Sequence, residues 1–254
     1  MNIIKEGFKN YYGKDFPNIR NVHFEEKKDL MGNLGTYKAE TKHTANPFFS
    51  SSFNRENGVY IYQTHYDPKV ALRIYKDFAN YKYLHHNDEL LVSELQNRQK
   101  DVELTEFPTG IVSIENKVIG QEIPFYEDHE TIKDIVLDGQ KKDMVNPITL
   151  QLEMLKILKE LVQNGIIYYD IHAKNFMFNI KSNDMKLIDF DINFITFDDK
   201  TTVYGSMLSN LKNTINTIDS IYGLNDKETL KVASSLEEVE ELVQKKGYTR
   251  SRGE

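Results

Sequence analysis

The stretch Tyr168–Asp191, YYDIHAKNFMFNIKSNDMKLIDFD, carries the strongest signal in this chain. Within it, Asn175 lies five positions after Asp170, and Asp189 lies fourteen positions after Asn175. The apolar segments that flank these residues are typical of short buried strands. Two carboxylates and one carboxamide are therefore expected on short connections beside the core.

The oxygen atoms of these side chains suit one kind of chemistry. Asn175 and Asp189 can supply hard oxygen ligands to a magnesium ion that also binds phosphate oxygens. Asp170 then stays available to accept a proton from an attacking hydroxyl, which is the division of roles that phosphoryl transfer needs. The types of these three side chains therefore suit phosphoryl transfer.

The chain around this stretch predicts helices in its second part. Asn146 is a favourable N-cap, and Pro147 suits the first helical position, where its missing N–H is not needed. Apolar residues then recur at helical spacing as far as Asn164-Gly165, a common helix ending. The other predicted elements are strands at Phe176–Asn179 and Lys186–Ile188 with a turn over 181–184, and helices at about 205–221 and 235–246, the last with a capping box of Ser235 and Glu238.

The first part predicts strands in the order hairpin, helix, hairpin. The residues of the expected strands are rich in β-branched and aromatic side chains. The expected helix has Leu90, Leu91 and Leu95 on one face. The elements are strands at 58–64 and 70–75, a helix at about 87–99, and strands at 109–114 and 117–123 that turn at Glu115-Asn116. The sequence therefore predicts an α+β fold.

The composition excludes several functional classes. At 39% hydrophobic residues, a chain of 254 residues can bury a core in one large domain or two small ones. The net charge of −7 does not favour nucleic-acid binding. No cysteine is present, so disulfides are excluded and a reducing cytoplasmic location is expected. No signal-peptide pattern and no apolar run long enough to span a membrane are seen, so no membrane association is expected.

Three motifs resemble those of the protein-kinase-like superfamily. The segment Asp170–Asn175, DIHAKN, resembles its catalytic loop. Ile188–Asp191 resembles the magnesium-binding DFG segment, with Asp191 where glycine is usual. Val70–Arg73, VALR, resembles the V-A-I-K strand, with Arg73 where lysine is expected.

The resemblance covers roughly residues 47 to 222 and implies a two-lobed fold with ATP between the lobes. A small antiparallel β lobe with one helix would span 47–126. A reduced helical lobe would span 127–254, and residues 1–46 would form an N-terminal extension. In this reading Asp170 orients the acceptor hydroxyl, while Asn175 and Asp189 hold Mg²⁺.

The resemblance also implies roles for residues of the small lobe. Ala71 and Arg73 lie two positions apart in a strand and therefore share a face, which would turn toward the nucleotide. Arg73 would steady the α- and β-phosphates and pair with a helical glutamate, Glu89 or Glu94, of which we favour Glu89. Its forked guanidinium cannot copy the geometry of a lysine. The alternative is a surface arginine on an edge strand, with Lys69 or Lys76 binding phosphate.

Other positions depart from the family pattern. Only Gly58 remains near the end of an eroded glycine-rich loop, and Glu127 would belong to the hinge that reads adenine. Tyr168 and Tyr169 replace the usual His and Arg, so control by a phosphorylated activation loop is not expected. His172, where protein kinases commonly carry lysine, is interpreted as a structural or proton-sharing neighbour of Asp170.

These features predict an ATP- and Mg²⁺-dependent kinase whose acceptor is a Ser or Thr hydroxyl of a protein. A small-molecule kinase of the aminoglycoside or choline type is an alternative, because the A-P-E segment is missing. A non-catalytic pseudokinase is a second alternative, which Arg73, the eroded loop and Asp191 favour. Transfer of AMP or another group in place of phosphate is a third.

Overall fold

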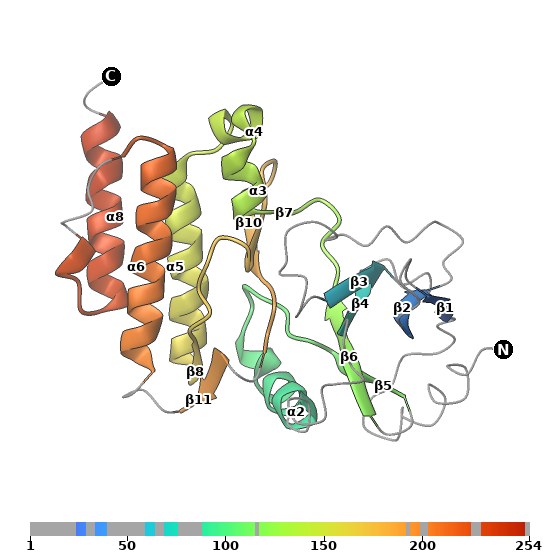
Figure 1. Ribbon diagram of the computed structural model, residues 1–254. Helices are drawn as coiled ribbons and strands as arrows, with labels where there is room; N and C mark the ends of the chain where they lie inside the picture. The colour runs from blue at the N-terminus through green and yellow to red at the C-terminus, as the bar shows by residue number, and fades with distance from the viewer. Residues whose placement is uncertain are drawn as a thin grey trace. The chain divides into compact units, whose positions relative to one another are not determined.

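The structure is a computed structural model that describes residues 24–28, 34–39, 59–63, 69–75, 88–114, 117–191, 194–198, 203–224 and 230–251. This part of the chain is mixed α+β with small antiparallel sheets, which confirms the predicted class (Figure 1). It divides into two compact units. The first comprises the described residues up to Asn97 together with Phe107–Glu127, and the second comprises Arg98–Glu106 and the residues from Asp128 onward.

The first unit contains a four-stranded antiparallel sheet with the strand order β3-β4-β6-β5. Both predicted hairpins are confirmed, while the turn residues Glu115 and Asn116 lie outside the described residues. The bulge between Val112 and Ser113 shifts the register of the second hairpin. The strands are β3 (Val59–Gln63), β4 (Val70–Tyr75), β5 (Gly110–Ile114) and β6 (Lys117–Pro124).

Helix α2 (Asp88–Arg98) is the helix expected in the first part of the chain, and a 3₁₀ turn, η1 (Gln99–Asp101), continues from it. Leu91, Val92 and Leu95 are buried. The expectation for Leu90 is wrong, because its side chain is 69% exposed. The error has a simple cause: neighbouring helical residues differ by about 100° in direction, so Leu90 and Leu91 cannot both face the core centrally.

A separate hairpin lies within the region that the sequence left as an extension. Strands β1 (Phe24–Lys28) and β2 (Leu34–Ala39) pair antiparallel, with a register shift between Lys27 and Lys28. For this region the sequence predicted only an N-terminal extension and left open whether residues 32–35 belong to a first pair of strands.

The second unit is built on α5 (Pro147–Gln163), which packs against α6 (Tyr204–Ile221) and α8 (Leu236–Ser251); the three helices lie side by side in Figure 1. The predicted start of α5 is confirmed, because the Asn146 side chain accepts a hydrogen bond of 2.9 Å from the backbone N–H of Ile148. Pro147 is the first helical residue. Helix α6 begins one residue before its predicted start and ends at the predicted residue.

Short strands complete the second unit in two antiparallel sheets. The predicted strands at Phe176–Asn179 and Lys186–Ile188 are confirmed as a hairpin, whose second strand begins two residues earlier, at Asp184. One sheet has the order β10-β9-β7, and the other pairs β11 with β8. The bounds are β7 (Glu130–Thr131), β8 (Ile166–Tyr168), β9 (Phe176–Asn179), β10 (Asp184–Leu187), β11 (Ile195–Phe197), with the short helices α3 (Ile132–Leu137) and α4 (Gly139–Asp143).

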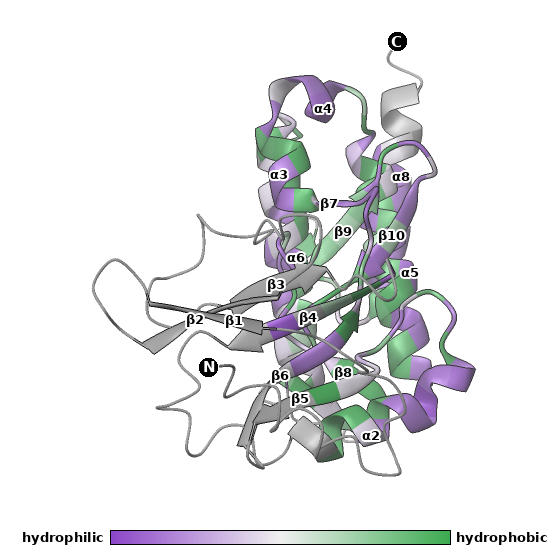
Figure 2. Ribbon diagram, turned by 90° about the vertical axis from the view of Figure 1, so that its right-hand side faces the viewer, coloured by the Kyte–Doolittle hydropathy of each residue, from purple (hydrophilic) through white to green (hydrophobic). Residues whose placement is uncertain are grey.

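The core of the second unit lies where α5 meets β8, β10, α6 and α8. Figure 2 colours much of α3 hydrophobic and α4 hydrophilic, in keeping with three buried apolar residues in α3 and none in α4. A charged group is also buried here: Asp219 of α6 accepts from Gln151 of α5 at 2.6 Å and pairs with Lys246 of α8 at 2.5 Å. Because a buried carboxylate needs partners, this pair and the amide fix how the three helices meet.

The last helix begins as the sequence predicted but with a shifted cap. The Ser235 hydroxyl accepts from the N–H of Glu238 at 3.2 Å, as in a capping box. The Glu238 carboxylate, however, bonds the N–H of Ser234 at 2.6 Å. In the part of the chain that the structure describes, no helix is both long and apolar enough to cross a membrane.

The turn that follows α5 depends on a glycine. Gly165 has φ +71°, and a Cβ at this position would collide with Oδ1 of Asp198. Asp198 is held there by Arg98, whose guanidinium lies 2.9 Å from the carboxylate and donates to the carbonyl of Asn164 at 2.8 Å. Gly165 therefore provides both a left-handed backbone and room for this ion pair.

We expect Gly165→Ala to destabilise the protein by clearly more than Gly223→Ala. Gly223 also has a positive φ, +73°, but a Cβ there would meet no atom of the described residues within 4 Å. The control therefore reports only the backbone strain, about 1–2 kcal/mol, and the difference reports displacement of the Arg98–Asp198 pair. Urea unfolding of both variants measures this, and equal free energies of unfolding would contradict the steric argument.

Candidate functional site: the loop from Asp170 to Asn175 and Asp189

The loop that follows β8 is held by hydrogen bonds along its whole length. Each of five consecutive backbone carbonyls, from residue 169 to residue 173, accepts a hydrogen bond. The donors, in order, are Asn210 Nδ2 (2.6 Å), Asn175 Nδ2 (2.9 Å), Thr214 Oγ1 (2.8 Å), Asn175 N (2.9 Å) and Lys133 N (3.0 Å). A loop with this many fixed carbonyls presents the Asp170 side chain from a rigid backbone.

Helix α6 supplies two of these donors from adjacent turns. Asn210 and Thr214 lie four residues apart and therefore on one face of the helix. They bond the carbonyls of Tyr169 and Ile171, which are the two neighbours of Asp170. The long helix thus anchors the backbone on both sides of the acid.

The Asn175 carboxamide is 99% buried and connects the loop to itself. Its Nδ2 lies within hydrogen-bonding distance of Oδ2 of Asp170 (2.9 Å), the carbonyl of Asp170 (2.9 Å) and the hydroxyl of Tyr168 (2.7 Å). A carboxamide nitrogen can only donate, so these acceptors identify this end of the amide as the nitrogen and the other end as the oxygen. Oδ1 of Asn175 has no hydrogen-bond partner among the described residues, which leaves it available to a cation.

Three contacts join this loop and the end of β8 to the segment that carries Asp189. The N–H of Ile188 donates to the carbonyl of Asn175 at 2.8 Å. The buried Tyr168 hydroxyl, which accepts from Asn175, lies 3.4 Å from the carbonyl of Asp189. The Tyr168 ring also contacts the Phe190 ring, with centroids 5.8 Å apart. The structure thus brings the segments that carry Asp170, Asn175 and Asp189 together.

Asp189 has a left-handed backbone, with φ +67°. A non-glycine residue rarely adopts this conformation, and such strain is concentrated at functional sites. Its Oδ1 atom is buried. The two flanking anchors, at Ile188 and at the Asp189 carbonyl, hold the strained residue in place.

The Asp170 carboxylate is kept ionised by its neighbours. Burial raises the pKa of this group, but His172 and the hydrogen bond from Asn175 act in the opposite direction and the net pKa lies below its usual value. Nε2 of His172 lies 3.4 Å from Oδ2 of Asp170. A carboxylate that is ionised and about one quarter exposed can accept a proton from a group that approaches it from solvent.

The donor set of this site fits magnesium. Asn175 and Asp189 offer a carboxamide and a carboxylate, both oxygen ligands of the kind Mg²⁺ prefers, and Mg²⁺ usually binds one or two protein groups plus phosphate and water. Among the described residues, no group of three or more His, Cys, Asp or Glu side chains could hold a metal by itself.

The candidate residues of the first unit form a separate group. Ala71 and Arg73 lie on β4 and are both buried, as the shared strand face requires. The alternative that Arg73 is a surface residue on an edge strand is wrong, because β4 pairs with β3 on one side and β6 on the other. Of the two alternative lysines, Lys69 is exposed, and Lys76 lies outside the described residues.

The other candidate residues of the first part of the chain are Gly58, Glu89, Glu94 and Glu127. Glu89 lies in α2, but its side chain is outside the described residues, as is the whole of Gly58. Glu94, the alternative to Glu89, is partly buried on the same helix. Glu127 is exposed and follows β6. Just after β6, the N–H of Phe125 donates a hydrogen bond of 2.7 Å to the carbonyl of Lys69.

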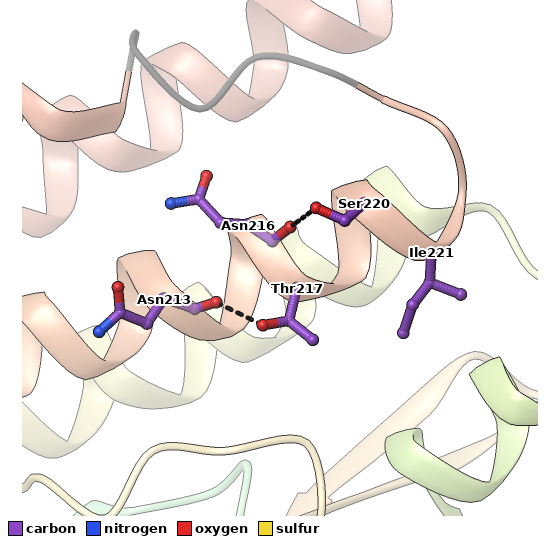
Figure 3. Close-up of a pocket in the computed structure, with 5 residues that line it drawn as sticks. All are labelled: Asn213, Asn216, Thr217, Ser220 and Ile221. Carbon is purple, nitrogen blue, oxygen red and sulfur yellow. Dashed lines mark hydrogen bonds between the residues drawn. The ribbon is translucent and has the colours of Figure 1, made fainter.

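A shallow pocket of about 620 Å³ lies elsewhere on the second unit. It is lined by Asn213, Asn216, Thr217, Ser220 and Ile221 of α6, as Figure 3 shows, and contains none of the predicted site residues. The Thr217 and Ser220 hydroxyls donate back to the helix, to the carbonyls four residues earlier. The pocket therefore does not alter the choice of site.

Sequence reasoning missed the residues that orient the site. Asn210 and Thr214 lie some forty positions after the loop, and their only local signal is two polar residues spaced by one turn in an otherwise apolar stripe. Tyr168 was noted only as a replacement in the family pattern. Its hydroxyl could have been suspected because a fully buried tyrosine needs a partner for its O–H.

Comparison with known proteins gives no assignment. No protein-family model matches the chain, and no curated protein matches it in sequence.

We expect Thr214→Val to lower the free energy of unfolding by about 1–3 kcal/mol, because it leaves the buried carbonyl of Ile171 without its donor. Thr217→Val on the same helix is the matched control. Its hydroxyl is exposed and bonds only the carbonyl of Asn213, so a change within about 0.5 kcal/mol is expected. Urea unfolding followed by circular dichroism measures both, and equal effects would show that the Thr214 anchor contributes nothing.

Proposed function

We propose that the protein is an ATP- and Mg²⁺-dependent phosphotransferase that moves the γ-phosphoryl group to a hydroxyl. The single observation that supports this most strongly is the hydrogen-bonded cluster of Asp170, Asn175 and the Asp189 segment, which joins an ionised carboxylate to two potential metal ligands. The proposal treats the two units as the small and large lobes of a protein-kinase-like fold, in which Arg73 steadies the α- and β-phosphates.

In the proposed reaction Asp170 acts on the acceptor hydroxyl. The hydroxyl oxygen forms a bond to the γ-phosphorus as the bond from that phosphorus to the β,γ-bridging oxygen breaks, and ADP leaves with the bonding electrons. The hydroxyl proton passes to the Asp170 carboxylate, which later releases it to solvent. The low pKa of Asp170 favours the ionised form that this role requires.

Asn175 and Asp189 hold the magnesium ion in this proposal. Held there, Mg²⁺ would supply positive charge that offsets the negative charge of the phosphate oxygens. The Asn175 amide is suited to the role because its NH₂ group, which has two hydrogens, faces three acceptor oxygens of the protein, so its oxygen is the end left for the ion. The left-handed backbone of Asp189 is held in place by the hydrogen bond of its neighbour Ile188 to Asn175.

The acceptor that we favour is a Ser or Thr hydroxyl of a protein. A small-molecule hydroxyl is the second candidate, and one observation favours it. Only fourteen residues separate Asp189 from the start of α6 at Tyr204, and three of them form β11, which is paired with β8. The described residues of this connection are therefore too few to bind an extended peptide.

We expect Asp170→Asn and Asp189→Asn to fail in different ways. Asp170→Asn should bind Mg·ATP normally but lose turnover by about 10²–10⁴-fold, because only the proton acceptor is removed. Asp189→Asn should also weaken Mg²⁺-dependent nucleotide binding, because a charged metal ligand is lost. Calorimetric titration with Mg·ATP and with ATP alone, together with an ADP-release assay, separates these effects.

The exposed carboxylate of Asp143, at the end of α4, provides the control for charge removal. Asp143→Asn should leave binding and turnover unchanged. If Asp189→Asn transferred phosphate as fast as the unmodified protein, the proposed metal site would be wrong. Tight Mg·ATP binding without any turnover in the unmodified protein would support a binding module instead of an enzyme.

Intact-mass measurement after incubation with Mg·ATP identifies the acceptor class. A protein kinase is expected to gain about 80 Da per phosphoryl group on itself or on an added protein, and the Asp170→Asn variant should gain none. ADP release that depends on an added small alcohol, with no mass gain on protein, would favour the second candidate. A gain equal to an AMP group would contradict phosphoryl transfer.

A further inference from the structure

Two nitrogen atoms converge on one oxygen of the Asp170 carboxylate. Nδ2 of Asn175 lies 2.9 Å from Oδ2, and Nε2 of His172 lies 3.4 Å from the same atom. No described residue contacts the other oxygen, Oδ1, within hydrogen-bonding distance. We propose that His172 is a positioning residue which, together with Asn175, occupies Oδ2 so that Oδ1 is the atom that receives the substrate proton. This inference rests on the proposed function.

The backbone of Asp170 is already fixed without His172. The carbonyls of Tyr169, Asp170 and Ile171 all accept hydrogen bonds from other side chains. What remains free is rotation about the side-chain bonds of Asp170, which decides which oxygen faces an incoming hydroxyl. One contact on Oδ2 limits this rotation, and a second contact from a different direction limits it further, because both would have to break for the two oxygens to exchange.

The two contacts differ in what else they do. Asn175 also provides the potential metal ligand Oδ1, so a substitution there disturbs several functions at once. The His172 side chain is 42% exposed, and its contact with Oδ2 is its only side-chain contact with a polar group among the described residues. Replacement of His172 therefore tests the orientation of Asp170 without removing a core residue.

The ring is placed for a single role. Its Nδ1 is buried and has no hydrogen-bond partner in the described part of the chain, whereas Nε2 faces a carboxylate. In a neutral imidazole only one nitrogen carries a hydrogen, and the neighbouring carboxylate favours that hydrogen on Nε2. In this proposal an N–H on Nε2 of His172 faces Oδ2 across the 3.4 Å contact, and a side chain that places a donor at the same reach can replace it.

The test compares three variants. In His172→Ala, kcat should fall by about 10- to 100-fold, as expected for a misoriented catalytic group, while KM for ATP and the affinity for Mg·ATP stay unchanged. His172→Gln places an amide N–H near the position of Nε2 and should restore most of kcat. His172→Asn is too short to reach Oδ2 and should resemble His172→Ala.

A second readout does not depend on turnover. The ¹³C carboxyl resonance of Asp170, assigned by its loss in Asp170→Asn, should move in His172→Ala and return toward its original position in His172→Gln. Unchanged kcat and an unchanged resonance in His172→Ala would overturn the inference while leaving the proposed function standing. Equal losses in the Gln and Asn variants, or a rise in KM that accounts for the loss, would also overturn it. Absence of Mg·ATP binding and of turnover in the unmodified protein would overturn the proposed function itself, and the inference with it.

Discussion

The Asn175 carboxamide is the interaction on which the arrangement of the site depends. It is buried, and its nitrogen contacts the Asp170 carboxylate, the Asp170 carbonyl and the Tyr168 hydroxyl. A buried amide that lost these acceptors would leave several polar groups without partners, at a cost of about 1–3 kcal/mol for each. The same bonds engage the nitrogen and leave Oδ1 without a hydrogen-bond partner among the described residues, so the network that stabilises the loop also leaves an oxygen for a cation.

Helix α6 extends this constraint into the body of the second unit. Asn210 and Thr214 hold the carbonyls on both sides of Asp170. Their helix is in turn fixed to α5 and α8 by the buried contacts of Asp219 with Gln151 and Lys246. The packed helix therefore holds this polar loop in a fixed position, which is the kind of preorganisation that a catalytic carboxylate requires.

Local signals were sufficient to predict many elements of the fold. The start of α5 could be predicted because Asn146 and Pro147 act within one turn, and the hairpins could be predicted because alternating strands are separated by short turns. The residues of the candidate site were also visible, because their types and spacing are local to Tyr168–Asp191. The kinase-like arrangement of the two units and the phosphotransferase activity remain predictions.

The contacts that orient the site could not be predicted, because they join residues far apart in the chain. Nothing near Asn210 or Thr214 indicates which carbonyls they bond. The left-handed backbone of Asp189 was also not predicted. Leu90 was wrongly expected on the apolar face of α2. Its residue type fits the apolar pattern, but its position on the helix points it away from the core.

The central claim is that Asn175 and Asp189 share one divalent ion next to Asp170. The most direct test is a crystal structure of the protein with Mn²⁺ and a non-hydrolysable ATP analogue, with the ion located by anomalous scattering. We predict an anomalous peak in contact with Oδ1 of Asn175, the Asp189 carboxylate and the phosphates, with Asp170 beside the terminal phosphate. A nucleotide bound with its metal elsewhere, or an Asn175 oxygen that faces no ion, would contradict the account.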